Sequence, residues 1–129
     1  MRALAIAMIV LGLAVPAAAA TARGTSLRIT IWETPAATPR VFTLRCNPSG
    51  GTVAHPAAAC ARLERLRRAA FAPTPPGTAC TMIYGGPQRA IVTGTLDGQR
   101  VWASFRRRDG CEIARWNRVA FLLGPVATP

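Results

Sequence analysis

Lysine is absent from this chain of 129 residues, histidine occurs once, and aspartate and glutamate together number only five. General acid–base catalysis depends on side chains that exchange protons near neutral pH, so few candidate pairs exist. A nucleophile motif of the form Gly-x-Ser-x-Gly does not occur either. These absences argue against an enzyme, and we expect neither catalytic residues nor a cofactor.

A metal site is also poorly supported. No two of the four cysteines are separated by the two residues that structural zinc sites commonly use. The single histidine, His55, precedes a proline in a stretch typical of a turn. We therefore expect no bound metal.

Positive charge is abundant, and all of it is carried by arginine. The 16 basic residues against five acidic ones give a formal net charge of +11. Such a charge attracts acidic surfaces through long-range fields but identifies no specific partner. The run Arg106-Arg107-Arg108 is interpreted as a solvated hairpin end, with a polyanion-binding patch as the alternative. The three tryptophans are too scattered for a stacking platform, so we expect no specific nucleic acid.

The N-terminus has the pattern of a signal peptide. Arg2 precedes an apolar run from Ala3 to Val15, and Pro16 and a series of small residues follow. The small-residue rule places the cleavage after Ala20 or Ala22, so residues 1–22 are the expected leader. The run is shorter than the roughly 20 residues that span a bilayer, which disfavours the alternative of an uncleaved anchor. We expect a secreted, extracellular protein with no membrane attachment after cleavage.

The four cysteines matter because the remaining chain, about 107 residues, can build only one domain with a modest core. In an oxidising compartment they most simply form two disulfides. Three pairings are possible from the sequence alone.

Periodicity predicts five strands. Leu27, Ile29 and Ile31 alternate with polar or larger residues, which is typical of a strand with one buried face. Asp97-Gly98 between two apolar runs predicts a tight hairpin turn. The turn cluster 47–51 is expected to lie outside any sheet or helix. The predicted strands are Ser26–Glu33, Arg40–Cys46, Arg89–Leu96, Gln99–Arg106 and Arg118–Leu123.

One segment changes period. Residues from Pro56 to Phe71 are mostly strong helix formers, and Cys60, Leu63, Leu66 and Ala70 share one face of the predicted helix. The prolines that follow end it. Because no strand–helix–strand repeat occurs, the fold class is α+β with an antiparallel sheet.

Several motifs in a fixed order carry a family resemblance. No single one is decisive, but their order and spacing together resemble the Streptomyces subtilisin inhibitor family, from about Leu27 to Leu123. The motifs are Cys46-Asn47-Pro48-Ser49-Gly50, His55-Pro56-Ala57-Ala58, Cys60-Ala61-x-Leu63, Cys80-Thr81-Met82-Ile83-Tyr84, Asp97-Gly98-Gln99-Arg100-Val101, Cys111-Glu112-Ile113 and Val119-Ala120-Phe121.

The resemblance implies a secreted serine protease inhibitor that binds as a substrate, with a reactive bond between Met82 and Ile83. It implies disulfides Cys46–Cys60 and Cys80–Cys111, a five-stranded antiparallel sheet with one main helix, and a second, short helix near residues 109–114. Homodimers through a sheet face are implied too, with Trp102 and Phe105 on a strand that either forms the interface or belongs to the core. The protease-binding loop would be Ala79, Cys80, Thr81, Met82, Ile83 and Tyr84.

These implications define the expected organisation of the chain: an inhibitor domain at residues 26–123 and a C-terminal tail at residues 124–129. The expected partner is an extracellular subtilisin-like or chymotrypsin-like protease, because the flexible thioether of Met82 suits broad apolar pockets. The alternative is a basic secreted protein of the same fold that binds acidic polymers or surfaces without inhibiting anything.

The chain departs from the family after Tyr84. Members usually have Asp-Pro there, whereas this chain has Gly85-Gly86-Pro87, and Thr81 replaces the usual proline. Glycine loses more backbone entropy on ordering than any other residue. The resulting hypothesis is that this side of the loop is freer, so that inhibition is temporary when protease is in excess.

Overall fold

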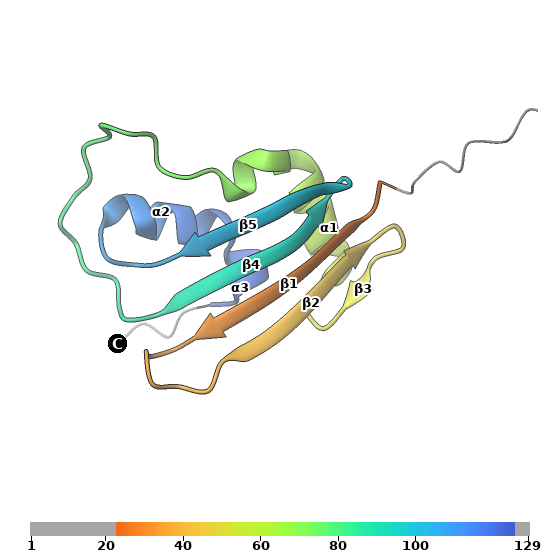
Figure 1. The fold of residues 1–129 in the computed structure, drawn as a ribbon, viewed down its shortest axis with the longest axis horizontal. Coiled ribbons are helices and arrows are strands. Elements are labelled where there is room, and N and C mark those ends of the chain that lie inside the picture. Colours follow the sequence, from red (N-terminus) through yellow and green to blue (C-terminus); the bar gives the residue numbers. More distant parts are fainter. Residues whose placement is uncertain (1–22, 126–129) are drawn as a thin grey trace, which may run out of the picture.

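The computed structural model describes residues 23–125, and the expected leader and the end of the tail, residues 126–129, lie outside this range. Figure 1 shows the order of the elements along the chain. They are β1 (Thr25–Trp32), β2 (Arg40–Cys46), β3 (Gly50–Gly51), α1 (Pro56–Leu66), the 3-10 helix η1 (Arg67–Phe71), β4 (Arg89–Leu96), β5 (Gln99–Phe105), α2 (Gly110–Arg118) and α3 (Ala120–Leu123). The predicted α+β class is confirmed.

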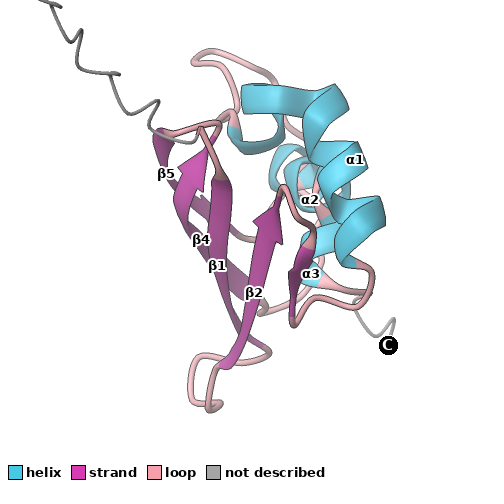
Figure 2. Ribbon diagram, turned by 90° about the vertical axis from the view of Figure 1, so that its right-hand side faces the viewer, coloured by secondary structure: helices cyan, strands magenta, loops and turns pink. Residues whose placement is uncertain are grey.

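The five strands form one antiparallel sheet in the order β3-β2-β1-β4-β5. Along β1 the predicted alternation holds, with Leu27, Ile29 and Ile31 buried and their neighbours more exposed. The helices cover one face of the sheet, and the other face is bare (Figure 2). The core therefore lies between the helices and a single face of the sheet.

No helix within residues 23–125 has the length and hydropathy needed to cross a bilayer.

The hairpin between β4 and β5 turns where the sequence predicts it. Asp97 has φ 51° and Gly98 has φ 77°. Positive φ at both central residues is the requirement of the type I′ turn, whose twist matches that of the flanking strands. The turn fixes the register in which Leu96 pairs with Gln99 and Ala90 pairs with Phe105. Phe105 is consequently part of the core, whereas Trp102, on the opposite face of β5, is 69% exposed on the bare side.

The main helix carries the predicted apolar face, but it is not one continuous α-helix. Leu63 is buried and Cys60 and Leu66 pack against the core. At Arg67 the backbone has φ 52°, so the α-helix ends at Leu66 and the chain continues as the 3-10 helix η1. The disulfide Cys46–Cys60 joins the end of β2 to α1, with Cα atoms 5.7 Å apart. This pairing confirms the one implied by the family resemblance.

The predicted strand Arg118–Leu123 is wrong. Arg118 is the last residue of α2, and Ala120–Leu123 forms the short helix α3. Val119, Leu122 and Leu123 are the buried residues, a spacing of three and four that matches helical periodicity and not the alternation of a strand. An apolar run this short does not distinguish the two structures by sequence alone.

The fifth strand is instead β3, within the cluster that we expected to lie outside the sheet. Gly50 and Gly51 pair with Arg45 and Leu44 of β2. Gly51 has φ 115°, and a side chain there would collide with the backbone of Thr43. Glycine is thus needed for the close approach of two backbones.

Candidate functional site

The candidate loop spans residues 72–88, which connect η1 to β4 without regular secondary structure. It runs as a long arc past α2 (Figure 1). Within it three consecutive apolar or aromatic side chains face solvent: Met82 is 92% exposed, Ile83 61% and Tyr84 66%. Large apolar groups grouped at the surface are typical of interaction sites.

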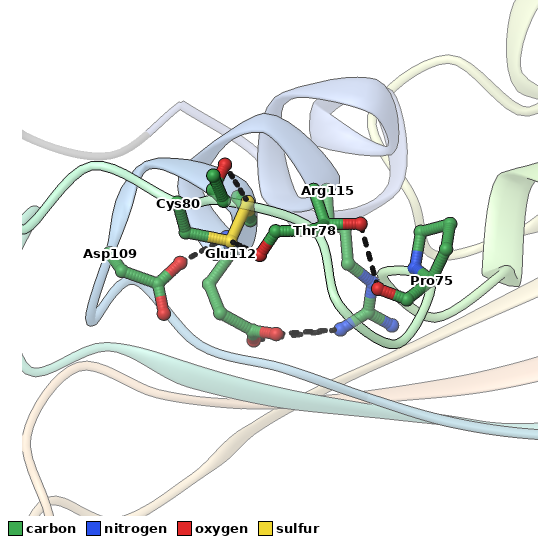
Figure 3. Close-up of a disulfide and its surroundings, with 8 residues drawn as sticks. Pro75, Thr78, Cys80, Asp109, Glu112 and Arg115 are labelled. Atoms are coloured by element: carbon green, nitrogen blue, oxygen red, sulfur yellow. Dashed lines mark hydrogen bonds and ion pairs between the residues drawn. A yellow bond between two sulfur atoms is a disulfide. The ribbon is translucent and has the colours of Figure 1, made fainter.

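The disulfide Cys80–Cys111 joins this loop to α2, with Cα atoms 5.4 Å apart. Cys111 lies in the first turn of α2, next to Gly110, the first residue of the helix. The Asp109 carboxylate caps that turn, because its Oδ1 accepts a hydrogen bond from the Glu112 N–H at 2.9 Å. Figure 3 shows Cys80, Asp109 and Glu112 around this bridge. The loop is therefore attached to a capped helix end, and the second disulfide implied by the resemblance is confirmed.

Two backbone hydrogen bonds flank the exposed residues. On the upstream side the Gly110 N–H donates to the Thr81 carbonyl at 2.9 Å, and on the downstream side the Gly85 N–H donates to the Arg107 carbonyl at 2.7 Å. Within residues 23–125, the segment from Met82 to Tyr84 takes part in no hydrogen bond between backbone groups. The peptide bond between Met82 and Ile83 therefore lies between two exposed residues, and the chain on each side of it is held by a backbone hydrogen bond.

Helix α2 also holds the start of the loop. The Arg115 Nε–H donates to the Ala72 carbonyl at 3.0 Å, and its guanidinium contacts Glu112 at 3.3 Å. Figure 3 shows Arg115 and Glu112 beneath the loop. Arg118 Nη1 donates to the Ala69 carbonyl at 3.0 Å. Nearer the disulfide, Thr78 Oγ1 donates to the Pro75 carbonyl at 2.7 Å. Contacts with α2, the hydrogen bond from Gly85 to Arg107 and a turn within the loop therefore hold it at several points between Ala72 and Gly85.

The expected freedom at the glycine pair is not found at Gly85. Besides its hydrogen bond to Arg107, Gly85 lies so close to α2 that an added Cβ would be 2.8 Å from Ile113 Cδ1 and 3.2 Å from Arg107 Cβ. Only Gly86, with φ 124°, needs the backbone freedom of glycine. Gly85 is therefore a site of close packing, and an aspartate there would displace the loop.

A substitution tests this close packing. Gly85→Ala is expected to cost about 1–3 kcal/mol of stability, the usual penalty for overpacking, and to move the loop away from α2. Thermal unfolding and limited proteolysis of the loop provide the measurement. In the double variant Gly85→Ala/Ile113→Ala the space is restored, so much of the loss should be recovered relative to Ile113→Ala alone. Equal losses in the two backgrounds would contradict the assignment.

One cluster in residues 23–125 has the composition of a metal site, namely Cys80, Asp109 and Cys111, whose ligand atoms lie within 4.8 Å of one another. Both sulfurs belong to the disulfide and offer no thiolate. The cluster is thus explained by the bridge and by the helix cap.

The residues predicted for the loop, Ala79 to Tyr84, lie together in one segment, and all of them except the partly buried Cys80 are exposed. His55 precedes α1 as its N-cap residue without a side-chain cap hydrogen bond. Sequence reasoning missed the contribution of Arg107, Gly110 and Arg115 to holding the loop. The only available signal was Asp109-x-x-Glu112, a spacing typical of a helix N-terminus.

The fold and this loop define a class of protein: a small α+β domain with two disulfides that presents a fixed, exposed peptide bond. The family model described as subtilisin inhibitor-like matches residues 23–107, which is 85 of the 129 residues. The chain belongs to this family, one of inhibitors and not of enzymes. The match includes the exposed segment and β5 and ends before α2.

A solved structure with a similar fold is that of Streptomyces caespitosus sermetstatin in complex with Bacillus licheniformis subtilisin. The sequence identity is 25% and the TM-score is 0.50. The similarity covers 74% of this chain and 96% of the sermetstatin chain. A comparison with curated protein sequences found no match.

Proposed function

We propose that this protein is a secreted inhibitor of subtilisin-like or chymotrypsin-like serine proteases, and that its reactive bond lies between Met82 and Ile83. The observation that carries the proposal is the fixation of both flanks of this exposed bond, by Thr81–Gly110 on one side and Gly85–Arg107 on the other. Family membership and the similarity to an inhibitor solved with subtilisin support it.

Binding would use the backbone of the loop, which forms no regular secondary structure within the domain. The segment Ala79 to Met82 can add a strand to the rim of a protease cleft, so that backbone hydrogen bonds give affinity and alternate side chains enter pockets. Met82 would fill the primary pocket, because its unbranched thioether adapts to broad apolar slots. With an exposed fraction of 92%, its side chain is free to do so without unpacking the domain.

Inhibition in place of digestion would follow from order that exists before binding. The disulfide and the two flanking hydrogen bonds reduce the entropy that the loop loses on binding. If the protease acylates at Met82, the new amine of Ile83 is only two residues from Gly85, whose N–H is bonded to Arg107. An amine held near the acyl bond favours its re-formation over hydrolysis by water.

A titration tests the proposal. Purified protein is added to a fixed amount of active subtilisin, and residual activity is measured after equilibration. A linear loss that reaches zero near one inhibitor domain per enzyme is the expected result. No loss at micromolar protein would refute the proposal, and salt-sensitive retention on heparin would then favour the alternative of a basic protein that binds acidic polymers.

Secretion and the domain boundaries belong to the same proposal. We infer that residues 1–22 are removed as a signal peptide, that the inhibitor domain spans residues 26–123, and that its partner is an extracellular protease. Mass spectrometry of the exported protein gives the mature N-terminus, expected at residue 21 or 23. A mature protein that retains Met1 would contradict this inference.

A homodimer through the bare sheet face is the remaining part of the proposal. Trp102 is 69% exposed on this face and Val41 39%. We expect the protein to sediment as a dimer at micromolar concentration and Trp102→Arg to sediment as a monomer, because a charge would be buried unpaired. Ala58→Arg adds the same charge to the exposed side of α1 and should leave the dimer intact. A monomeric parent protein would refute the dimer and leave the inhibitor proposal in place.

A further inference from the structure

A cleft of about 460 Å³ lies beside the exposed loop, on the side that follows the Met82–Ile83 bond. Tyr84, Gly86 and Pro87 of the loop form part of its wall. Much of the remaining wall is formed by four arginines from two segments, and we call this pocket the arginine cleft. The four are Arg89, Arg106, Arg107 and Arg108. Arg89 begins β4, and the other three follow the end of β5.

The charge of the arginine cleft is not neutralised by the domain. The ion pairs among residues 23–125 are Arg40–Glu33, Arg67–Asp97 and Arg115–Glu112, and none includes a cleft arginine. The carboxylate that is nearest in the sequence, that of Asp109, accepts the Glu112 N–H as a helix cap. Four positive charges therefore surround one cleft with no acidic group set against them.

Two of these arginines are held in place. The Arg89 guanidinium carbon lies 4.3 Å from the centre of the Trp32 ring, a stacking distance. Arg107 Nη1 donates to Gln88 Oε1 at 3.3 Å, and its guanidinium carbon lies 5.9 Å from the centre of the Trp116 ring. Guanidinium groups that are fixed and poorly compensated favour a carboxylate supplied from outside.

The position of the cleft indicates what would supply it. The Arg107 carbonyl accepts the Gly85 N–H at 2.7 Å, so the arginine run is attached to the loop three residues beyond Met82. A protease that holds the Met82–Ile83 bond in its active site must place its own surface over Tyr84 and the residues around it. A long polyanion, in contrast, would need a continuous basic stripe, and it would compete with the protease for the same surface.

We propose that the arginine cleft receives carboxylates from the protease surface on the leaving-group side of the active site, so that the inhibitor selects proteases with an acidic rim there. This inference rests on the proposed function, and it specifies which serine proteases the inhibitor would prefer. Charge complementarity of this type raises the association rate and is weakened by salt.

The test compares two forms of one subtilisin, with either two glutamates or two glutamines on the surface beside the leaving-group subsites. The inhibitor variant Arg106→Gln/Arg108→Gln removes two exposed charges from the cleft. The matched control, Arg65→Gln/Arg68→Gln, removes two exposed charges from α1 and η1. Stopped-flow association rates are measured at low salt and again at high salt, and melting temperatures verify that all proteins are folded.

We expect the parent protein to associate with the acidic form about tenfold faster than with the neutral form at low salt, and the difference to shrink at high salt. The cleft variant should lose this preference, and the control should keep it. Equal rates for both subtilisin forms, with inhibition still stoichiometric, would overturn the cleft proposal and leave the proposed function standing. Unchanged kinetics with weaker retention of the cleft variant on heparin would assign the arginines to a polyanion. Failure of the parent protein to inhibit either form would overturn both proposals.

Discussion

Replacing Met82 with arginine is expected to convert the protein into a trypsin inhibitor, with trypsin bound about 100- to 1,000-fold more tightly than by the parent. The estimate corresponds to roughly 3–4 kcal/mol for a desolvated charge pair between the new guanidinium and the aspartate of a trypsin-like pocket. Chymotrypsin inhibition should weaken, because its apolar slot must then desolvate a charge without a partner. Met82 is 92% exposed, so the substitution should leave the stability of the domain within about 0.5 kcal/mol.

Inhibition constants for trypsin, chymotrypsin and subtilisin provide the measurement, and Ala58→Arg is the control. Residue 58 is exposed on α1, outside the loop, so this variant adds an equal charge away from the protease-binding segment. It should leave the trypsin constant within a few-fold of the parent value. If residue 82 has no influence on trypsin while subtilisin inhibition persists, the reactive bond is not Met82–Ile83.

The parts of the fold that the sequence predicted correctly depend on local patterns. Leu27, Ile29 and Ile31 alternate because one face of β1 is buried and the other is bare. Asp97 and Gly98 tolerate positive φ, which the type I′ turn demands of both residues. In each case the physical cause lies within a few residues of the chain, so the sequence contains the whole signal.

The parts that were missed depend on contacts between distant residues. Gly50 and Gly51 form a strand only because Leu44 and Arg45 lie beside them, and two glycines have no side-chain pattern to indicate it. Residues 119–123 become a helix because three of them meet the core at helical spacing. An apolar run of this length is compatible with either structure until its packing partners are known.

The candidate site divides in the same way. The apolar residues of the loop and the cysteine beside them are visible in the sequence, and their exposure was expected. The flanking hydrogen bonds are not visible, because Thr81 and Gly110 are 29 residues apart and Gly85 and Arg107 are 22 apart in the sequence. The hypothesis of a loose glycine pair came from intrinsic flexibility alone, and at Gly85 tertiary contacts with Ile113 and Arg107 override it.

Loss of the Cys80–Cys111 bridge is expected to damage inhibition more than it damages the fold. The bridge closes a sequence separation of 31 residues, for which the loop-entropy model gives about 4 kcal/mol of stability. The core lies between the sheet and the helices, and neither Cys80 nor Cys111 is among the residues that form it or pack against it. The variant Cys80→Ser/Cys111→Ser should therefore fold, at reduced stability, but expose a loop whose upstream side is held near α2 mainly by the Thr81–Gly110 hydrogen bond.

Because an exposed backbone hydrogen bond opens far more readily than a covalent bridge, the freed loop should reach conformations in which the Ile83 amine departs before the bond re-forms. Mass spectrometry of mixtures with catalytic amounts of subtilisin should show cleavage at Met82–Ile83 about 10- to 100-fold faster than in the parent.

The matched control is Cys46→Ser/Cys60→Ser, which removes a bridge between β2 and α1, with a sequence separation of 14. On the same model it costs about 3 kcal/mol, and it should leave the cleavage rate of the folded fraction much closer to that of the parent. If both variants are cleaved equally fast at matched folded fractions, loss of stability alone explains the cleavage, and the bridge has no specific role in holding the bond. If neither is cleaved faster than the parent, the two flanking hydrogen bonds suffice to hold the loop.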